Sequence, residues 1–483
     1  MTIANPGDRC RLYSLETRQG TEPAAGGTRM TAQRQELVTF LRHLGDDDSP
    51  FLMRRTDAAP LWSDQARHDA AYRHDPELYA LCSLAERARP GQQARGLFQL
   101  LARSRAGLSA EVRRTLDRAA AQLLVALEPD GVLTVFLALR RTRANHRHTR
   151  RAILRYLLNH PRLEELARRR RPACVDCLEH ALGKNVARAC VRFLAAGDRT
   201  GGYVRRHLLR FADDAERAAK VLLFLYHRGE CPPPVAVNPV PPAGDLAPPP
   251  EVPRTVTATN RGEIAATLVH IYRGGSNDEL RAALERYVCE AAASLPRFDG
   301  TVALVLDASA STRGYGEREF CVVSQSEAFR RVLAQCCGRL HFFQVGGSGD
   351  PPQPDGDTDL AGALLDALDT DADVVAVVSD GYENHLRGDL ARVVASLPGA
   401  GVATPVVYCH SKFSGKDDLR WRRPAPALPE LEFWHQADFS DVLWFLFAHA
   451  RAPRGEAFVR GELRKRLACL ETGRGTWIER WSR

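Results

Sequence analysis

Apolar positions in the first half of the chain recur at helical spacing. Between positions 31 and 230 they repeat at three- and four-residue steps, as at Leu116, Ala120 and Leu123. This spacing places them on one face of an α-helix. Turn residues such as Pro90-Gly91 separate the helical stretches. Successive amphipathic helices with short connections predict an α-helical, HEAT-like repeat domain over residues 31–230.

The pattern changes at position 301 to short apolar runs that alternate with helical stretches. The runs predict strands at 302–306, 340–345, 374–378, 402–409 and 431–434. Helical spacing between and after them predicts helices at 326–336, 360–368, 387–397, 440–450 and 461–470. Strands that alternate with helices are typical of a doubly wound, Rossmann-like parallel sheet. The predicted fold class is therefore α + α/β, with the sheet domain at 301–483.

Three further segments complete the predicted organisation. Residues 1–30 have no core pattern and predict a flexible tail. Residues 231–253 hold ten Pro in 23 positions and predict a linker or insert, because proline cannot sit inside a helix or a central strand. Residues 254–300 return to helical spacing and predict helices that lead into the sheet domain. The sequence contains no apolar run long enough to span a membrane and no signal-peptide pattern, so we expect a cytoplasmic protein without a membrane partner.

Oxygen-bearing side chains follow three of the predicted strands. Asp307, Ser309 and Ser311 come after the first strand, Thr358 after the second and Asp380 after the third. The carboxyl ends of parallel strands meet at one edge of a sheet, where ligands bind. Oxygen donors of this kind suit a hard cation such as Mg²⁺. Hydroxyl donors leave the cation under-neutralised, so we expect an acidic group of a protein ligand to complete its shell.

These five residues carry a family resemblance. Asp307-x-Ser309-x-Ser311 with a distal Thr358 and a distal Asp380 closely resembles the metal-ion-dependent adhesion site of a von Willebrand factor A domain. The resemblance covers about 180 residues. It implies that Ser309, Ser311 and Thr358 contact Mg²⁺ or another divalent cation directly, and that Asp307 and Asp380 act mainly through water. It also implies recognition rather than catalysis, so we expect no enzyme activity.

The flanking sequence extends the resemblance. A helical-repeat domain that leads through the segment LPRFDG at 295–300 into the adhesion-site strand resembles the Ro autoantigen, or TROVE, family. Those proteins close a ring of HEAT-like helices with such a domain and bind small noncoding RNAs as ribonucleoproteins. The resemblance implies Ro-like RNA binding by the helical domain.

Charge supports a polyanion partner for the helical half. Residues 301–483 hold 21 Lys+Arg and 25 Asp+Glu, a net charge of −4. Because the whole chain has a net charge of +8, residues 1–300 carry a net charge of +12. A dense basic stretch between 140 and 171 provides candidate RNA-binding residues. They are Arg140, Arg141, Arg143, His146, Arg147, His148, Arg150, Arg151, Arg155, Arg168, Arg169, Arg170 and Arg171. His146, His148 and Tyr156 could stack on or hydrogen-bond to exposed bases. A solvated helix face is the ordinary alternative for such a charge run.

The sequence is also compatible with functions other than RNA binding. The alternative function is a protein-interaction adaptor that acts with a MoxR-type AAA ATPase. A metal-dependent hydrolase would need a base near the cation, and Glu383 and His385 are the nearest in sequence. Cys174 and Cys177 with His146 and His148 could form a zinc site, but both cysteines fall in a helical pattern, which favours buried thiols.

Overall fold

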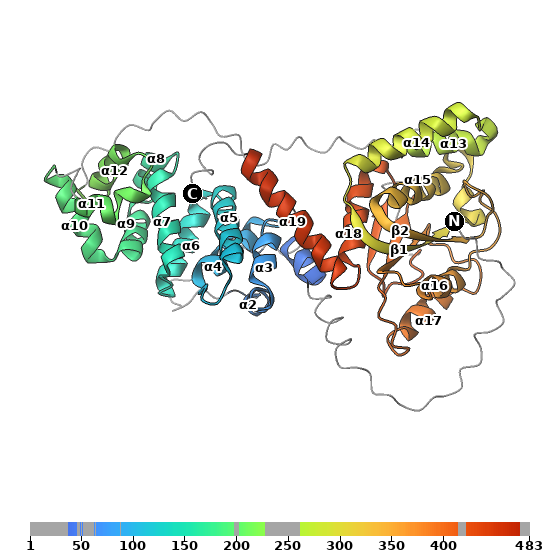
Figure 1. Ribbon diagram of the computed structural model, residues 1–483, viewed down its shortest axis with the longest axis horizontal. Helices are drawn as coiled ribbons and strands as arrows, with labels where there is room; N and C mark the ends of the chain where they lie inside the picture. The colour runs from blue at the N-terminus through green and yellow to red at the C-terminus, as the bar shows by residue number, and fades with distance from the viewer. Residues whose placement is uncertain are drawn as a thin grey trace.

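A computed structural model describes residues 37–45, 49, 51, 62, 64–86, 88–197, 202–227, 261–413 and 422–473. A body of helices lies at one end of the molecule and a sheet covered by helices at the other (Figure 1). The fold is therefore α + α/β, as the sequence predicts. The predicted tail at 1–30 and the Pro-rich segment at 231–253 lie outside the described residues. No helix in the described ranges combines the length and apolarity needed to cross a membrane.

The helical body starts with a helix at residues 37–45. Its further helices are α2 (Gln65–His74), α3 (Pro76–Cys82), α4 (Pro90–Ala102), α5 (Ala110–Ala126), α6 (Pro129–Arg141), α7 (Arg147–Asn159), α8 (Leu163–Arg169), α9 (Arg171–Leu182), α10 (Lys184–Ala195), α11 (Gly202–His207) and α12 (Ala215–His227). Helices α10 and α11 lie at the end of this body that is farthest from the sheet (Figure 1).

Local sequence determines where several of these helices begin. The Asp75 side chain accepts the Leu78 backbone N–H and so caps α3, whose first residue is Pro76. Proline is favoured at this position, because the first helical N–H has no partner in any case. Pro90 and Pro129 likewise open α4 and α6. The prolines that interrupt the helical pattern of the sequence thus start the next helix.

The sheet has five parallel strands in the order β2-β1-β3-β4-β5. They are β1 (Phe298–Asp307), β2 (Cys337–Val345), β3 (Val374–Ser379), β4 (Val406–Ser411) and β5 (Glu430–Phe433). The fourth strand starts at Val406 rather than at the predicted position 402, because Pro405 has no N–H to donate to a ladder. The strand order reverses between β1 and β3, so their following loops diverge and leave a crevice.

Helices cover both faces of the sheet. They are α13 (Glu263–His270), α14 (Asp278–Ala293), α15 (Cys321–Cys336), α16 (Leu360–Leu368), α17 (Asp389–Ser396) and α18 (Phe439–Ala448), and α18 is followed by α19 (Arg454–Gly473). In Figure 1, α13, α14 and α15 lie above the sheet, and α16 and α17 lie below it. Side chains of β1 alternate between the two layers: Leu304 belongs to one apolar core and Val305 to the other. Burial on both faces explains the continuous apolar run in the sequence.

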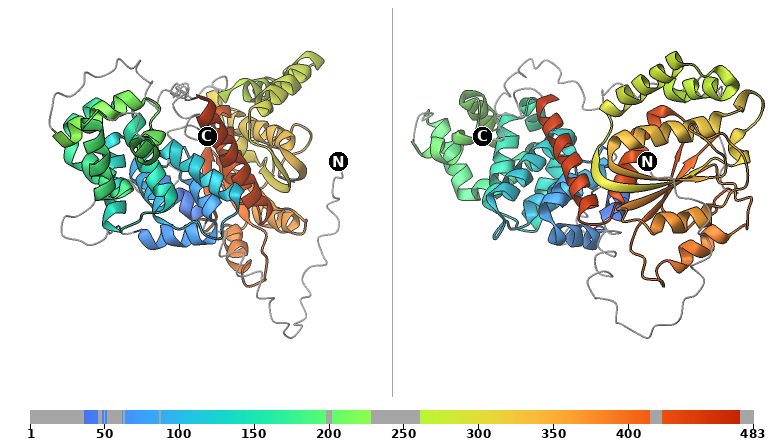
Figure 2. Two further views of the ribbon diagram at one scale, coloured as in Figure 1. Left: turned by 60° about the vertical axis from the view of Figure 1, so that its left-hand side comes forward. Right: turned by 45° about the vertical axis from the view of Figure 1, so that its right-hand side comes forward.

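Helix α19 joins the two bodies. It follows the last helix of the sheet body, yet it packs against α3 and α5 of the helical body (Figures 1 and 2). Arg460 and Arg464 of α19 both contact the carboxylate of Glu77 in α3, at 2.9 and 2.7 Å. Residues nearly 400 positions apart are thereby held together.

Candidate metal centre

Asp307 lies at the carboxyl end of β1 and is fully buried. The Ser309 backbone N–H donates to its Oδ1 at 2.9 Å, and the Ser379 hydroxyl donates to its Oδ2 at 2.7 Å. Ser379 is the last residue of β3, the strand beside β1. Both carboxylate oxygens are thus fixed in orientation at the crevice between the two strands.

Ser309 and Ser311 present their hydroxyls side by side. The chain turns sharply after Ser309 into a 3₁₀ helix, Ala310–Arg313. The Thr312 hydroxyl closes this turn by donating to the Ser309 carbonyl at 2.8 Å. The two serine Oγ atoms lie 3.1 Å apart. The alternating Ser-x-Ser spacing therefore places two oxygen donors on the same side of the turn.

Thr358 arrives on the loop that follows β2. The Ala310 N–H donates to the Gly356 carbonyl at 3.1 Å, which holds this loop against the serine turn. The approach requires glycine at Gly346, whose φ is +64° and where a Cβ would lie 2.9 Å from the Ser309 Cα. Thr358 is fully buried, and its hydroxyl has no hydrogen-bond partner among the described residues.

Asp380 follows β3 directly and is also fully buried. Its Oδ1 accepts the Tyr382 N–H at 3.1 Å, whereas its Oδ2 is buried without a hydrogen-bond partner. The His410 Nε2 lies 3.0 Å from the Asp380 carbonyl and fixes the backbone. Burial, and then the negative charge of Asp307, raise the pKa of Asp380 to about 7. Burial also raises the pKa of Asp307.

The electrostatics fit a bound cation. Two buried carboxylates at close range are costly when both are charged, and a buried polar atom without a partner costs about 1–3 kcal/mol. A divalent cation would neutralise the carboxylates, and its coordination shell could take up the unpaired oxygens of Thr358 and Asp380. All side-chain donors at the site are oxygens, the ligands of Mg²⁺ rather than of zinc. The residues present therefore fit Mg²⁺ or a similar hard cation.

A buried ion-pair network supports the loop that carries Thr358. Glu327 in α15 is fully buried and accepts hydrogen bonds from Arg330 at 2.6 Å and from Arg331 at 2.7 Å. Each arginine also donates to Asp350 at 2.9 Å. Because Asp350 lies on the β2 loop, α15 helps to fix the position of Thr358. The sequence analysis did not identify this network, or the roles of Ser379 and His410.

The basic stretch at 140–171 divides into paired and unpaired residues. Arg143, Arg147 and Arg151 are exposed and have no acidic partner among the described residues. Most of the other arginines form ion pairs with acidic side chains or donate hydrogen bonds to backbone carbonyls. Arg170 makes a two-pronged contact with Asp130 at 2.7 and 2.9 Å, and Arg140 pairs with Asp176 at 2.7 Å.

Several further members of the basic stretch have structural roles. Arg169 pairs with Glu165, while Arg150 and Arg171 donate to the carbonyls of Ala181 and Leu225. Arg141, Arg155 and Arg168 each have an interaction within the protein. Only part of the predicted RNA-binding set is therefore left open to a partner.

The aromatic members of this region are less accessible than the sequence suggests. Tyr156 is 1% exposed and packs edge-on against Phe136, so the expectation that it stacks on bases is wrong. Its position on the apolar face of α7 explains this. His146 and His148 are half-buried and stack on each other with ring centroids 5.4 Å apart. Burial lowers the pKa of His148 to about 4.

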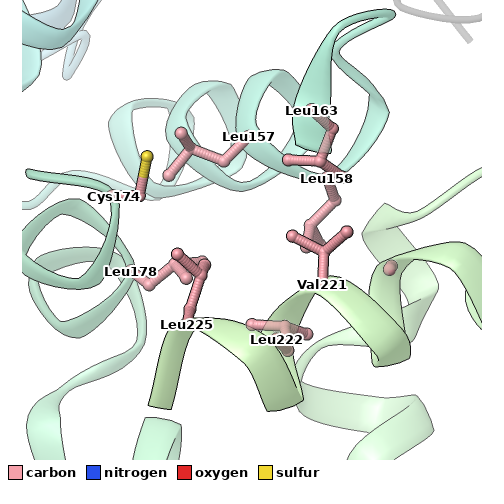
Figure 3. A pocket seen from close by; sticks show the side chains of 9 residues that line it. Leu157, Leu158, Leu163, Cys174, Leu178, Val221, Leu222 and Leu225 are labelled. Atoms are coloured by element: carbon pink, nitrogen blue, oxygen red, sulfur yellow. The ribbon is translucent and has the colours of Figure 1, made fainter. Parts of the chain in front are cut away.

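The zinc alternative has no support in the structure. Cys174 and Cys177 are both buried in α9. Figure 3 shows Cys174 among leucine and valine side chains of α7, α8, α9 and α12, in an apolar pocket without a second metal ligand. Burial raises the pKa of both thiols above their usual range. A thiol that stays protonated is a poor zinc ligand.

A cluster that the sequence did not reveal lies in the helical body. His43, Asp64 and His68 bring potential ligand atoms within 4.8 Å of one another and could hold a metal ion. Asp64 Oδ2 accepts from His43 at 2.7 Å and from Gln92 at 2.9 Å, whereas Asp64 Oδ1 forms an ion pair with Arg95 Nε at 3.1 Å but no hydrogen bond among the described residues. The i,i+4 spacing of Asp64 and His68 was the available sequence signal.

Hydrogen bonds hold the pKa of Asp64 low. Burial by itself would raise this pKa, but hydrogen bonds with His68, Gln92 and His43 outweigh burial and hold it well below its usual range. With Arg95 alongside, the cluster forms a network of hydrogen bonds and ion pairs that joins residues 37–45 to α2 and α4.

Comparisons with known proteins complete the description. No protein-family model matches the sequence, and no curated protein matches it significantly. Among solved structures, the chain is similar to the crystal structure of the Deinococcus radiodurans RO (RSR) protein, at 14% sequence identity and a TM-score of 0.34. The match covers 89% of this chain and 99% of the other. Similarity at this level carries no functional assignment, which has to come from the residues of the site.

Proposed function

We propose that this protein is a non-enzymatic binding scaffold of the von Willebrand A type, whose sheet edge holds Mg²⁺ and takes an acidic group from a partner. The observation that carries the proposal is the pair of buried oxygens without hydrogen bonds, Thr358 Oγ1 and Asp380 Oδ2. They belong to different loops, and the Ser311 hydroxyl is close enough to the Asp380 carboxylate to offset part of the rise in its pKa that burial causes. Asp307, held by Ser309 and Ser379, would act through water as the resemblance implies.

The contacts of Glu383 argue against the hydrolase alternative. Its carboxylate oxygens accept the backbone N–H groups of Gly388 at 2.5 Å and Leu390 at 2.9 Å. A carboxylate committed to two backbone donors is poorly placed to activate water. The proposal therefore assigns the cation to recognition.

Mg²⁺ titration calorimetry on the wild type and on three variants tests the cation site. Thr358→Val and Asp380→Asn remove donors without changing side-chain size, and both should abolish or strongly weaken Mg²⁺ binding. Asp366→Asn, at an exposed position of α16, should leave binding unchanged. In the wild type, Mg²⁺ at about 100 times its Kd should stabilise the fold by about 2.7 kcal/mol, seen as a higher unfolding temperature. A wild-type protein that binds no divalent cation would contradict the proposal.

A second part of the proposed function is Ro-like binding of small noncoding RNA by the helical body. The exposed Arg143, Arg147 and Arg151 support it, since Arg147 and Arg151 lie one turn apart on α7 and reach the same face. Arginines without acidic partners are suited to phosphate contacts. Electrophoretic mobility shift of a structured small RNA at low salt tests this. Arg147→Glu with Arg151→Glu should weaken the shift, and Arg281→Glu in α14 should not.

A further inference from the structure

Exposed apolar side chains gather on the loops around the metal centre. Tyr315 is 86% exposed, Tyr382 42% and Leu386 63%. Tyr315 follows Ser311 by four residues, and Tyr382 and Leu386 follow Asp380 by two and six. Among the described residues, the other strongly exposed large apolar side chains are Phe193 and Tyr203 in the helical body and Leu365 on α16. Three of these six exposed apolar side chains thus belong to two loops of the candidate metal centre.

Contacts through Arg422 and Phe413 connect the loop of Tyr382 to the loop of Tyr315. The Arg422 guanidinium lies over the rings of Tyr382 and Phe413, 5.4 and 5.2 Å from their centroids. Phe413 in turn lies beside Gly314, where a Cβ would be 3.7 Å from its ring. Tyr315 is the next residue along the chain. We call Tyr315, Tyr382 and Leu386, together with the intervening Phe413 and Arg422, the apolar rim.

Hydrogen bonds hold the loop that presents Leu386 in a defined conformation. Leu386 has a φ of +47°, a left-handed conformation that a leucine rarely adopts. The two hydrogen bonds to the Glu383 carboxylate, from Gly388 and Leu390, hold the loop in this shape. Strained backbone persists where the surroundings enforce it, and such positions cluster at functional sites. A side chain that is held outward in advance also loses little entropy when it packs against a partner.

The charges around the site favour a carboxylate on an apolar segment over a nucleic acid. Mg²⁺ between the carboxylates of Asp307 and Asp380 would leave the centre close to neutral, and Arg422 adds a positive group close to Asp380. The β2 loop, which carries Thr358, exposes the carboxylates of Asp355, Asp357 and Asp359. These would repel a chain of phosphates more strongly than a single carboxylate.

We propose that the metal centre and the apolar rim together bind a segment of a partner protein that carries one Asp or Glu beside a large apolar residue. The carboxylate completes the cation's coordination, and the apolar side chain packs on Tyr315, Tyr382 and Leu386. Because the rim residues lie at most six positions from a metal-site residue, an extended partner segment can present both side chains within about six residues of each other. This inference rests on the proposed cation site.

The test uses the full chain and a phage-displayed library of random 12-residue peptides. The library is bound in Mg²⁺ and eluted with EDTA, and an enriched peptide is synthesised for fluorescence polarisation. Enriched sequences should pair Asp or Glu with Trp, Phe or Leu. Tyr315→Ser and Leu386→Ser should each weaken peptide binding about tenfold or more, as expected for residues at the centre of an interface. Tyr203→Ser and Leu365→Ser, at exposed positions outside the rim, serve as matched controls and should have no effect.

Calorimetric titration with Mg²⁺ in the absence of peptide distinguishes a failure of the apolar rim from a failure of the cation site. The rim variants should keep the wild-type Mg²⁺ affinity, which also shows that they fold. If Mg²⁺ binds but enriched peptides need no apolar residue, or the rim variants bind peptide as the wild type does, the rim proposal is wrong and the cation site stands. A library that yields no EDTA-eluted peptide, or RNA binding that needs both Mg²⁺ and the rim, also overturns it. A wild type without Mg²⁺ affinity overturns both.

Discussion

The buried carboxylate of Glu327 helps to hold a loop of the candidate site in position. Glu327 has no exposed surface and is the shared partner of Arg330 and Arg331, which also contact Asp350 on the Thr358 loop. Removing one member of a buried ion pair leaves the others desolvated without compensation. The effect of this residue on the metal site is therefore indirect, through the position of a loop.

Glu327→Gln tests this role. The substitution keeps the side-chain size but removes the charge, so it should lower the free energy of unfolding by about 3 kcal/mol. It should also weaken Mg²⁺ binding, because the Thr358 loop loses its anchor. Urea unfolding and Mg²⁺ calorimetry measure the two effects. Glu290→Gln, in an exposed pair with Arg286, is the control and should change stability by less than about 0.5 kcal/mol.

Acid should destabilise the helical body through His160. Burial lowers the pKa of His160 to about 4, below the usual value of about 6.5 in an unfolded chain. The unfolded state therefore binds more protons between these pH values, so stability is full above pH 6.5 and falls as the pH drops toward 4. This group alone should cost about 2 kcal/mol between pH 7 and pH 5. Urea unfolding of His160→Gln should show a smaller loss, and the exposed His74→Gln should match the wild type.

At the scale of elements, α19 decides how the two bodies are connected. It belongs by sequence to the sheet half but lies along α3 and α5 (Figure 1). Its polar contacts include the ion pairs of Arg460 and Arg464 with Glu77 and of Glu471 with Arg118, and the Arg466 guanidinium donates to the Leu84 carbonyl at 2.6 Å. Glu77 is buried, so loss of its arginine partners would leave a buried charge without compensation.

Arg460→Ala with Arg464→Ala should loosen this connection. The double variant leaves Glu77 buried with only the Thr115 hydroxyl as a side-chain donor, at a cost of about 3 kcal/mol. We expect faster proteolysis and a larger radius of gyration in small-angle X-ray scattering, while Mg²⁺ affinity stays at the wild-type value. Lys465→Ala, whose lysine forms an exposed pair with Glu462, is the matched control. Unchanged scattering in the double variant would show that the ion pairs with Glu77 are not needed to hold α19 against α3.

Over the whole molecule, charge divides between the two halves. The first 300 residues carry net +12 and the remainder net −4. In space, the unpaired arginines of the basic stretch lie in the helical body, whereas the candidate metal centre lies in the sheet body (Figure 1). Two binding functions on separate bodies should fail independently.

RNA and Mg²⁺ binding should therefore respond to different changes. EDTA or Asp307→Ala should leave RNA affinity unchanged. Reversal of Arg143, Arg147 and Arg151 to Glu should weaken RNA binding and reduce the slope of log K against log salt by about three, one for each lost phosphate contact. RNA binding measured at several salt concentrations, with and without EDTA, distinguishes the two. A folded Asp307→Ala protein that has lost RNA binding would refute the separation.

The sequence by itself determined the elements and the chemistry of the candidate site. Strict helical spacing and runs of residues buried on both strand faces are local patterns, so the fold class and most strands were predictable. The donors Asp307, Ser309, Ser311, Thr358 and Asp380 were predictable because parallel strands bring their carboxyl ends to one edge.

Only the tertiary structure decided which side chains support or surround that site. Ser379 reaches Asp307, and Glu327 reaches the Thr358 loop through Arg330 and Asp350, across distances in sequence that carry no periodic signal. The same holds for α19 against α3, for the buried Tyr156, and for the arginines that pair within the helical body. Burial and pairing depend on what packs against a residue, and that is fixed by long-range contacts rather than by the residue's own neighbours in the chain.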